Sequence, residues 1–223
     1  GEESAPDETT LCRFRHLLEK HQLGEAIFRC VKAHLNANGL KVGTGTIVDA
    51  TVISAPQSTK NREGKRDPEM ASGRKGNQWH YGMKLHIGVD SETKVIHSVA
   101  TTPGNAADAN SIGALLHGGE TAVWGDGAYQ GRTDVIKAVA PNAEDLTNRP
   151  WLHRKWCNLG ARRENREKSK IRARVEHPFL VLKRLFGFSR TRYRGLAKNT
   201  HRLLVTCALV NLYMVRRRLL AMG

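Results

Sequence analysis

The sequence has few cysteines, and no two of them are close together. Its four cysteines, Cys12, Cys30, Cys157 and Cys207, form no C-x-x-C pair. Such scattered positions are typical neither of a disulfide framework nor of a structural zinc site. We therefore expect four free thiols and a protein of the reducing cytoplasm.

Long apolar runs and several well-known motifs are also missing. The longest apolar stretch, residues 203–215, includes Thr206 and Asn211 and is shorter than the roughly 18 residues that a membrane span needs. No G-x-x-x-x-G-K-[ST] loop occurs, which argues against the use of ATP or GTP. The chain shows neither an H-E-x-x-H motif nor a Ser-His-Asp or Cys-His signature. These absences exclude a membrane protein, a P-loop enzyme and the common hydrolases with a covalent intermediate.

Acidic residues are scarce in the last third of the chain. Residues 149–223 hold 20 Lys and Arg but only three acids, a net charge of +17, whereas residues 1–148 hold 16 basic and 18 acidic side chains. The whole chain of 223 residues therefore carries +15. A strongly basic segment attracts polyanions through phosphate neutralisation and counterion release, and nucleic acid is the usual partner. Apolar residues between the charges indicate that this segment folds.

Hydrophobic periodicity and turn residues predict a mixed α/β fold. Helices are expected within 9–39 (divided at Gly24), at 108–116, at 131–140, within 162–188 and at 198–222, and strands at 46–54, 80–90, 94–102, 121–125 and 143–147. Three strands in antiparallel order, followed by alternating helices and strands, describe a mixed sheet flanked by helices. The ribonuclease H-like fold has this order and is one candidate among several.

Residues 55–78 form a long polar segment with hardly any apolar anchor. The segment carries six basic side chains: Lys60, Arg62, Lys65, Arg66, Arg74 and Lys75. A structureless connection of this length inside a domain is either functional or disordered. Contact with a DNA end and a disordered surface loop both remain open interpretations.

Two aspartates stand at strand positions where a charge is costly. Asp49 lies in the middle of the first predicted strand, between Val48 and Ala50, and Asp126 directly follows the fourth strand. A buried carboxylate requires a partner or a metal ion to offset its desolvation. If the two strands are neighbours, the two carboxylates converge and form a site for Mg²⁺ or Mn²⁺. Taken alone, each aspartate could equally be a cap or a turn residue.

A third acid stands out because of its surroundings. Glu176 lies among apolar residues inside the basic third of the chain. Lys183 follows it by seven residues and Arg172 precedes it by four, so both share its helical face if the helix continues through Pro178. This arrangement would place a metal-binding carboxylate beside cations that hold phosphate, although a solvated pair at this spacing is the simpler interpretation.

Five motifs, in this order, together resemble one family. They are IVDATVI around Asp49, GNQWHYGMKLHIGVD at 76–90, WGDGAYQG around Asp126, RVEHPFLVLKRLFGF at 174–188 and RYRGLAKN at 192–199. The chain resembles, over nearly its whole length, the bacterial insertion-sequence DDE transposases of the insertion-sequence-five group.

The resemblance implies a ribonuclease H-like catalytic domain with a metal-dependent triad. Residue by residue, the triad falls on Asp49, Asp126 and Glu176, and the associated Arg and Lys fall on Arg172 and Lys183. Ser169 stands where the family has a Tyr, which puts one DNA or metal-shell contact in doubt. Family members carry a further N-terminal helical region, and we expect this chain to begin after most of it.

The predicted function is cleavage of DNA at transposon ends and transfer of the 3′-OH strand into target DNA, with two Mg²⁺ or Mn²⁺ bound. Asp49, Asp126 and Glu176 would be catalytic and metal-binding residues. The DNA-binding residues would be Arg172, Lys183, Lys65, Arg66, Arg74, Lys75, Arg192 and Arg194. An end-binding protein without catalysis and a plain metal-dependent nuclease are the alternatives.

The chain is expected to divide into three parts. Residues 1–43 would be a helical remnant, 44–188 the ribonuclease H-like catalytic domain and 189–223 a basic helical segment that packs on it. The partners would be terminal inverted repeats and target DNA, with a homo-oligomer on DNA, no membrane and no nucleoside triphosphate. We expect a cytoplasmic, nucleoid-associated bacterial protein.

Overall fold

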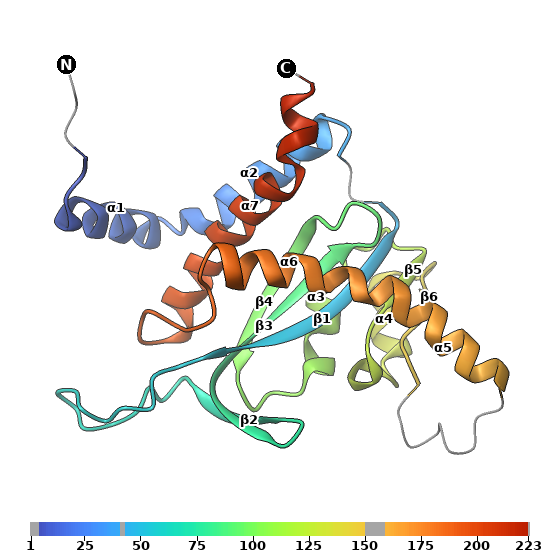
Figure 1. The fold of residues 1–223 in the computed structure, drawn as a ribbon, viewed down its shortest axis with the longest axis horizontal. Coiled ribbons are helices and arrows are strands. Elements are labelled where there is room, and N and C mark those ends of the chain that lie inside the picture. Colours follow the sequence, from blue (N-terminus) through green and yellow to red (C-terminus); the bar gives the residue numbers. More distant parts are fainter. Residues whose placement is uncertain (1–4, 41–42, 150–158, 223) are drawn as a thin grey trace.

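The computed structural model describes residues 5–40, 43–149 and 159–222 and consists of one mixed sheet with helices on both faces (Figure 1). The strands are β1 (Gly45–Ser54), β2 (Ala71–Lys75), β3 (Gln78–Asp90), β4 (Ile96–Pro103), β5 (Ala122–Trp124) and β6 (Glu144–Asp145). The α-helices are α1 (Glu8–Lys20), α2 (Leu23–Ala37), α3 (Ile112–Leu115), α4 (Thr133–Val139), α5 (Leu159–Arg172), α6 (Glu176–Leu180) and α7 (Leu196–Leu220). Short 3₁₀ segments lie at η1 (Asp108–Ser111), η2 (Gly127–Tyr129) and η4 (Ala173–Val175), and η5 (Val181–Leu185) is a π-helical turn.

The strand order confirms the predicted ribonuclease H-like mixed sheet. The strands follow the order β2-β3-β1-β5-β6, and β4 also pairs with β3. β3 is antiparallel to β1, β2 and β4, whereas β5 runs parallel to β1 and β6 parallel to β5. β1 therefore lies in the centre of the sheet, between a meander on one side and two parallel strands on the other.

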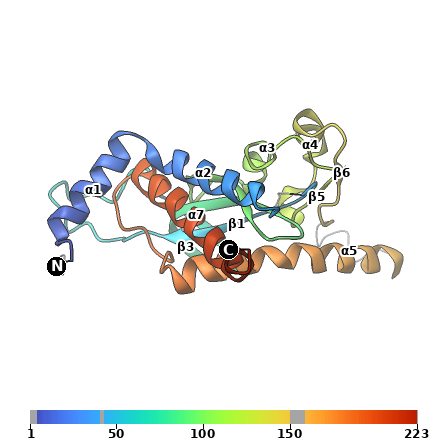
Figure 2. The same ribbon diagram turned by 90° about the horizontal axis from the view of Figure 1, so that it is seen from above.

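Alternation along β1 separates two hydrophobic cores. Ile47 and Ile53 belong to the larger core, which contains residues of α2, α7 and the 173–188 segment, while Val48 belongs to a smaller core beneath α3 and α4. Helix α5 lies on one side of the sheet and α3 and α4 on the other (Figure 2). Because successive strand residues point to opposite faces, β-branched residues at consecutive positions can fill both cores at once.

The two N-terminal helices are confirmed, but their boundary is not where the glycine predicts it. The chain turns at Gln22, whose φ is 51°, and Gly24 lies inside α2. The Gly24 N–H donates to Nε2 of His201 in α7 at 2.9 Å, and a Cβ at position 24 would lie 2.8 Å from the same ring. Gly24 thus permits the close approach of α2 and α7 rather than ending a helix.

The prediction of an entirely structureless 55–78 segment is wrong for its last third. Residues 71–75 form β2, which pairs with β3 from Ala71↔Gly82 to Lys75↔Gln78 through a turn at Gly76, whose φ is 60°. Hydrogen bonding between backbones stabilises this ribbon, so it needs no apolar alternation. Hydrophobic patterning therefore cannot detect it.

The chain stays helical from α5 through η5. Arg172, Val175 and Glu176 all have right-handed helical backbone angles, and Pro178 lies within α6 before the π-helical turn. Position 176 therefore follows 172 by one helical turn on one face, as the sequence predicts for an unbroken helix.

The division into three parts remains a prediction. The larger core joins Phe28, Ile47 and Leu203, one residue from each predicted part. Within the described ranges, no helix is long and apolar enough to cross a membrane.

Candidate active site

Asp49 lies within β1, and Asp126 lies two residues past the end of β5, the parallel neighbour of β1. The register of β1 and β5 pairs Thr46 with Val123 and Ile47 with Trp124. Each aspartate follows the last of these pairs by two residues. Ile47 packs in the larger core, so alternation directs Asp49 to that same face, where Arg172 at the end of α5 reaches it. The condition under which the sequence predicts convergence, that these strands are neighbours, is met.

Each aspartate is also held by a nearby backbone N–H group. Oδ1 of Asp49 accepts from Ala50 N–H at 2.7 Å, and Oδ1 of Asp126 accepts from Ala128 N–H at 2.9 Å as the N-cap of η2. Both residues are partly exposed. The carboxylates are therefore oriented by the backbone and remain within reach of solvent.

Arg172 lies between two of the predicted triad residues. Its Nη1 is 3.2 Å from Oδ2 of Asp49, and its Nη2 is 3.9 Å from Oε1 of Glu176. The Asp49 side chain is 18% exposed, whereas that of Glu176 is 70% exposed. The end of α5 thus carries Arg172 to the sheet, and Glu176 extends from the next turn into solvent beside it.

Lys183 connects η5 to the same strand. Its Nζ donates to Thr51 Oγ1 at 2.6 Å and to the carbonyl of Val52 at 3.1 Å. Thr51 is two residues beyond Asp49 and therefore faces the same side of β1. The structure brings both predicted cations of the motif, Arg172 and Lys183, to the face of the sheet that carries Asp49.

Ser169, at the position of the family's Tyr, has a structural contact of its own. Its Oγ accepts from Nδ2 of Asn148 at 3.0 Å, and the Asn148 N–H donates to the carbonyl of Gly125 at 3.0 Å. The backbone of Asn148 therefore lies beside Gly125, the residue that precedes Asp126. Ser169 ties α5 to the strand that positions this carboxylate.

Tyr129 lies behind the site, in the smaller core with Val48, although the sequence did not single it out. It is fully buried, and its hydroxyl has no hydrogen-bond partner among the described residues. Burial raises the pKa of Tyr129 well above its usual value, and the charges of Asp108, Asp49 and Asp126 raise it further. The phenol therefore stays protonated close to three carboxylates. Its position in the WGDGAYQG motif could have drawn attention to Tyr129, but only the fold shows that the side chain is buried.

A second ion pair lies near this tyrosine on the opposite face of the sheet. Nζ of Lys84 on β3 is 2.8 Å from Oδ1 of Asp108 and also donates to the carbonyl of Ala106 at 2.7 Å. His86 lies two residues after Lys84 on β3, and burial lowers its pKa to about 4. Lys84 thereby compensates the charge of Asp108, the carboxylate that raises the pKa of Tyr129 the most.

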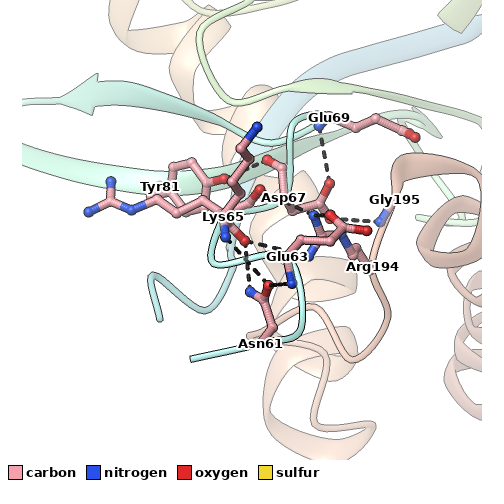
Figure 3. Close-up of polar contacts among 9 residues, drawn as sticks. Asn61, Glu63, Lys65, Asp67, Glu69, Tyr81, Arg194 and Gly195 are labelled. Atoms are coloured by element: carbon pink, nitrogen blue, oxygen red, sulfur yellow. Dashed lines mark hydrogen bonds and ion pairs between the residues drawn. The ribbon is translucent and has the colours of Figure 1, made fainter. Parts of the chain in front are cut away.

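The predicted DNA-binding loop is docked against the start of α7 (Figure 3). Glu63 Oε2 is 2.6 Å from Nη2 of Arg194. Asp67 Oδ2 accepts from Gly195 N–H at 2.6 Å, and Glu69 Oε2 accepts from Leu196 N–H at 2.7 Å. Asp67 and Glu69 thus satisfy backbone donors at the N-terminus of α7, where negative charge is favoured, while Glu63 pairs with a side chain.

Docking brings several predicted basic residues together. Lys65 and Arg66 are exposed beside Arg194, and the Arg66 guanidinium lies 5.4 Å from the ring centroid of Tyr81. Arg192, two residues before Arg194, is also exposed. These residues form a basic patch around residue 194, which is separate from the cations at Asp49.

Arg74 and Lys75, in the β2–β3 hairpin, lie far along the sheet from Asp49. Arg74 is exposed on β2, and the side chain of Lys75 lies outside the described part of the chain. Trp79, opposite Arg74, is eight residues along β3 from Ile87, the partner of Asp49. Eight strand residues span about 26 Å. The structure therefore does not bring this part of the predicted DNA-binding set to the carboxylates.

The residues at the site fit a divalent cation. Asp49 in β1 and Asp126 just past the end of the neighbouring β5 offer carboxylate oxygens, and the exposed Glu176 side chain is one helical turn from Arg172. Within residues 5–40, 43–149 and 159–222, however, no three His, Cys, Asp or Glu side chains form a ready-made metal site. Arg172 instead pairs with the carboxylate of Asp49.

Comparison with protein families gives one match. The family model for the transposase DDE domain matches residues 41–212, more than three quarters of the chain. The match includes β1, β5 and the segment from α5 to η5, the elements that carry the candidate site.

Proposed function

Because the chain belongs to the transposase DDE domain family, we propose that it cleaves DNA at the ends of a mobile element and joins those ends to target DNA. The placement of Asp49 in β1 and of Asp126 just past the end of β5, the parallel neighbour of β1, carries this proposal. Each aspartate follows the paired residues Ile47 and Trp124 by two positions, so we expect both carboxylates to act on one phosphodiester.

The proposed reaction consists of two substitutions at phosphorus. In the first, the oxygen of water forms a bond to phosphorus while the bond to the 3′ oxygen breaks, which leaves a 3′-hydroxyl on the element. In the second, this hydroxyl forms a bond to a target phosphorus and displaces a target 3′ oxygen. The second step exchanges one phosphodiester for another, so it requires no nucleoside triphosphate.

Asp49 and Asp126 would hold the divalent cations, with Glu176 turning toward them as the third carboxylate. When bound, Mg²⁺ or Mn²⁺ supplies Lewis-acid activation of the attacking oxygen and stabilises the leaving oxygen. We expect two ions, because three carboxylates suffice for a pair about 3.5–4 Å apart.

Arg172 and Lys183 would hold DNA phosphates beside the carboxylates. Both are cations within hydrogen-bonding range of β1 residues at or near Asp49. A guanidinium binds phosphate through two parallel hydrogen bonds, so Arg172 can exchange its contact with Asp49 for one with the substrate. The exposed basic residues of the last third would attract the rest of the duplex, and we expect a homo-oligomer on DNA.

The test uses a labelled duplex with the element's terminal inverted repeat and Mg²⁺ or Mn²⁺. Asp126→Asn and Asp49→Asn should each lower cleavage at least 100-fold while DNA binding stays within about twofold. Asp134→Asn, at an exposed position of α4, is the matched control and should cleave normally. Strand transfer by Asp126→Asn at the wild-type rate would show that this triad is wrong.

An end-binding protein without catalysis is the second candidate. The pairing of Arg172 with Asp49 favours it. The same experiment separates the alternatives. Joined products support the transposase, cleavage alone supports a nuclease, and binding without cleavage supports the end-binding protein.

A further inference from the structure

The β2–β3 hairpin presents an unusually exposed aromatic side chain. Trp79 on β3 is 69% exposed, although Trp is among the residues that gain most from burial. It stands directly opposite Arg74 of β2. The hairpin lies at the edge of the sheet, away from α5 (Figure 1).

Arg74 is held in place by the turn of the hairpin. Its Nε donates to the carbonyl of Gly76 at 3.0 Å, and its Nη2 donates to Oδ1 of Asn77 at 3.2 Å. Little side-chain entropy is therefore lost when the guanidinium binds an anion. A preorganised cation beside an exposed indole is the combination that binds single-stranded nucleic acid.

A second aromatic residue, Tyr81, and a second arginine, Arg66, lie near Trp79 and Arg74. Trp79 and Tyr81 are two residues apart on β3 and face the same side. The guanidinium of Arg66 covers the Tyr81 ring at 5.4 Å from its centroid, and Arg194 is bound to the same loop. Tyr81 is only 8% exposed, so Trp79 is the aromatic side chain here that a base can reach, and the exposed Arg74 and Arg66 are complementary in charge to a phosphate backbone.

We propose that this hairpin is a DNA contact in which the indole of Trp79 stacks on an unpaired base and Arg74 binds the adjacent phosphate. The inference rests on the proposed function and adds a second contact to it. Trp79 is about 26 Å along β3 from the register of Asp49. At about 3.4 Å per nucleotide, the stacked base lies about eight nucleotides from the phosphodiester at the carboxylates. The hairpin therefore acts on flanking DNA and takes no part in the chemical step.

The first test measures binding of a fluorescently labelled single-stranded oligonucleotide in the presence of EDTA, where no cleavage occurs. Trp79→Ala should weaken binding about 5- to 150-fold, the range that corresponds to one stacked base, while Trp79→Phe retains most of the affinity. Arg74→Ala should lower the slope of log K against log salt by about 0.7, and Trp79→Ala should leave this slope unchanged. Phe14→Ala, at a 57% exposed aromatic of α1, is the matched control and should bind normally.

Indole fluorescence provides the second measurement. The oligonucleotide should quench the emission of the wild-type protein, and most of this quenching should be lost in Trp79→Phe. Melting temperatures equal to that of the wild type show that the variants fold, as expected for an exposed side chain.

The outcomes separate this proposal from the proposed function. If Trp79→Ala binds and quenches like the wild type, or changes only the oligomeric state, the hairpin contact is wrong while the transposase function stands. If the wild-type protein binds neither single-stranded nor duplex DNA, both are wrong. Asp134→Asn, at an exposed position of α4, should bind the oligonucleotide normally, because it leaves the hairpin unchanged.

Discussion

Arg172 Nη1 lies 3.2 Å from Oδ2 of Asp49, which joins the last residue of α5 to the middle of the central strand. The guanidinium thus supplies positive charge to a carboxylate that would bind a metal ion. It is also 3.9 Å from Glu176. A metal ion at Asp49 would therefore compete with Arg172 for this carboxylate.

Arg172→Gln should bind Mn²⁺ more tightly than the wild type in the absence of DNA. The substitution removes a cation that competes with the metal for Asp49. The half-saturating Mn²⁺ concentration, measured by thermal stabilisation or calorimetry, should fall severalfold, while DNA cleavage falls because a phosphate ligand is lost. Arg174→Gln is the control, since Arg174 donates to the carbonyl of Ser91 instead. Weaker Mn²⁺ binding by Arg172→Gln would show that Arg172 orients Asp49 rather than competing for it.

Tyr129→Phe should separate stability from activity. The hydroxyl is buried without a hydrogen-bond partner among the described residues, so its removal should leave the melting temperature unchanged or raise it. Cleavage should fall about tenfold or more, because the protonated phenol can donate to a site carboxylate once the metal is bound, and such charged hydrogen bonds contribute about 1.5–3 kcal/mol. Full activity together with raised stability would assign Tyr129 to packing alone.

Asp67→Ala should release the docked loop. It removes the carboxylate that accepts from Gly195 N–H at the start of α7, a contact of about 1 kcal/mol for a helix cap. Limited trypsin digestion should then cleave faster after Arg62, Lys65 and Arg66. Glu92→Ala, at an exposed position of the β3–β4 turn, should digest like the wild type. Equal digestion of Asp67→Ala and the wild type would show that other contacts hold the loop.

Stability should fall as the pH falls from about 6.5 toward 4. Burial lowers the pKa of His86 from 6.5 to about 4 and that of His97 from 6.5 to about 3. Below pH 6.5 the unfolded chain therefore binds more protons than the folded protein. Each histidine should contribute a slope of about 1.4 kcal/mol per pH unit to the free energy of unfolding.

Urea unfolding at several pH values measures this slope. The double variant His86→Gln/His97→Gln should show a shallower dependence between pH 6.5 and 4, whatever its stability at neutral pH. An unchanged slope in the double variant would assign the acid sensitivity to other groups.

Local patterns predicted much of the fold. β1 is recognisable because β-branched residues between Gly45 and Pro56 favour a strand, and α7 because its apolar residues recur at helical spacing. The hairpin strand β2 was missed, since it is stabilised by backbone pairing with β3 and has no apolar alternation. The start of α2 was misplaced because Gly24 serves a contact with His201, which lies 177 residues away.

The candidate site divides in the same way. The family motifs singled out Asp49, Asp126 and Glu176, and the scarcity of acids in residues 149–223 drew further attention to Glu176. The spacing of four residues linked Arg172 to Glu176 on one helical face. The burial of Tyr129 left no trace in local sequence, because burial depends on what the rest of the chain packs against a residue.

By itself, the sequence determined the kind of substrate and the kind of chemistry. A net charge of +17 over residues 149–223 indicates a polyanion, and the family motifs place acids on predicted strands. Only the tertiary structure decided that β1 and β5 are neighbours, that Arg172 reaches Asp49, and that the loop acids bind the start of α7. The physical reason is that strand pairing and ion pairing join residues distant in sequence, and their free energy depends on the packing of the whole sheet rather than on any local window.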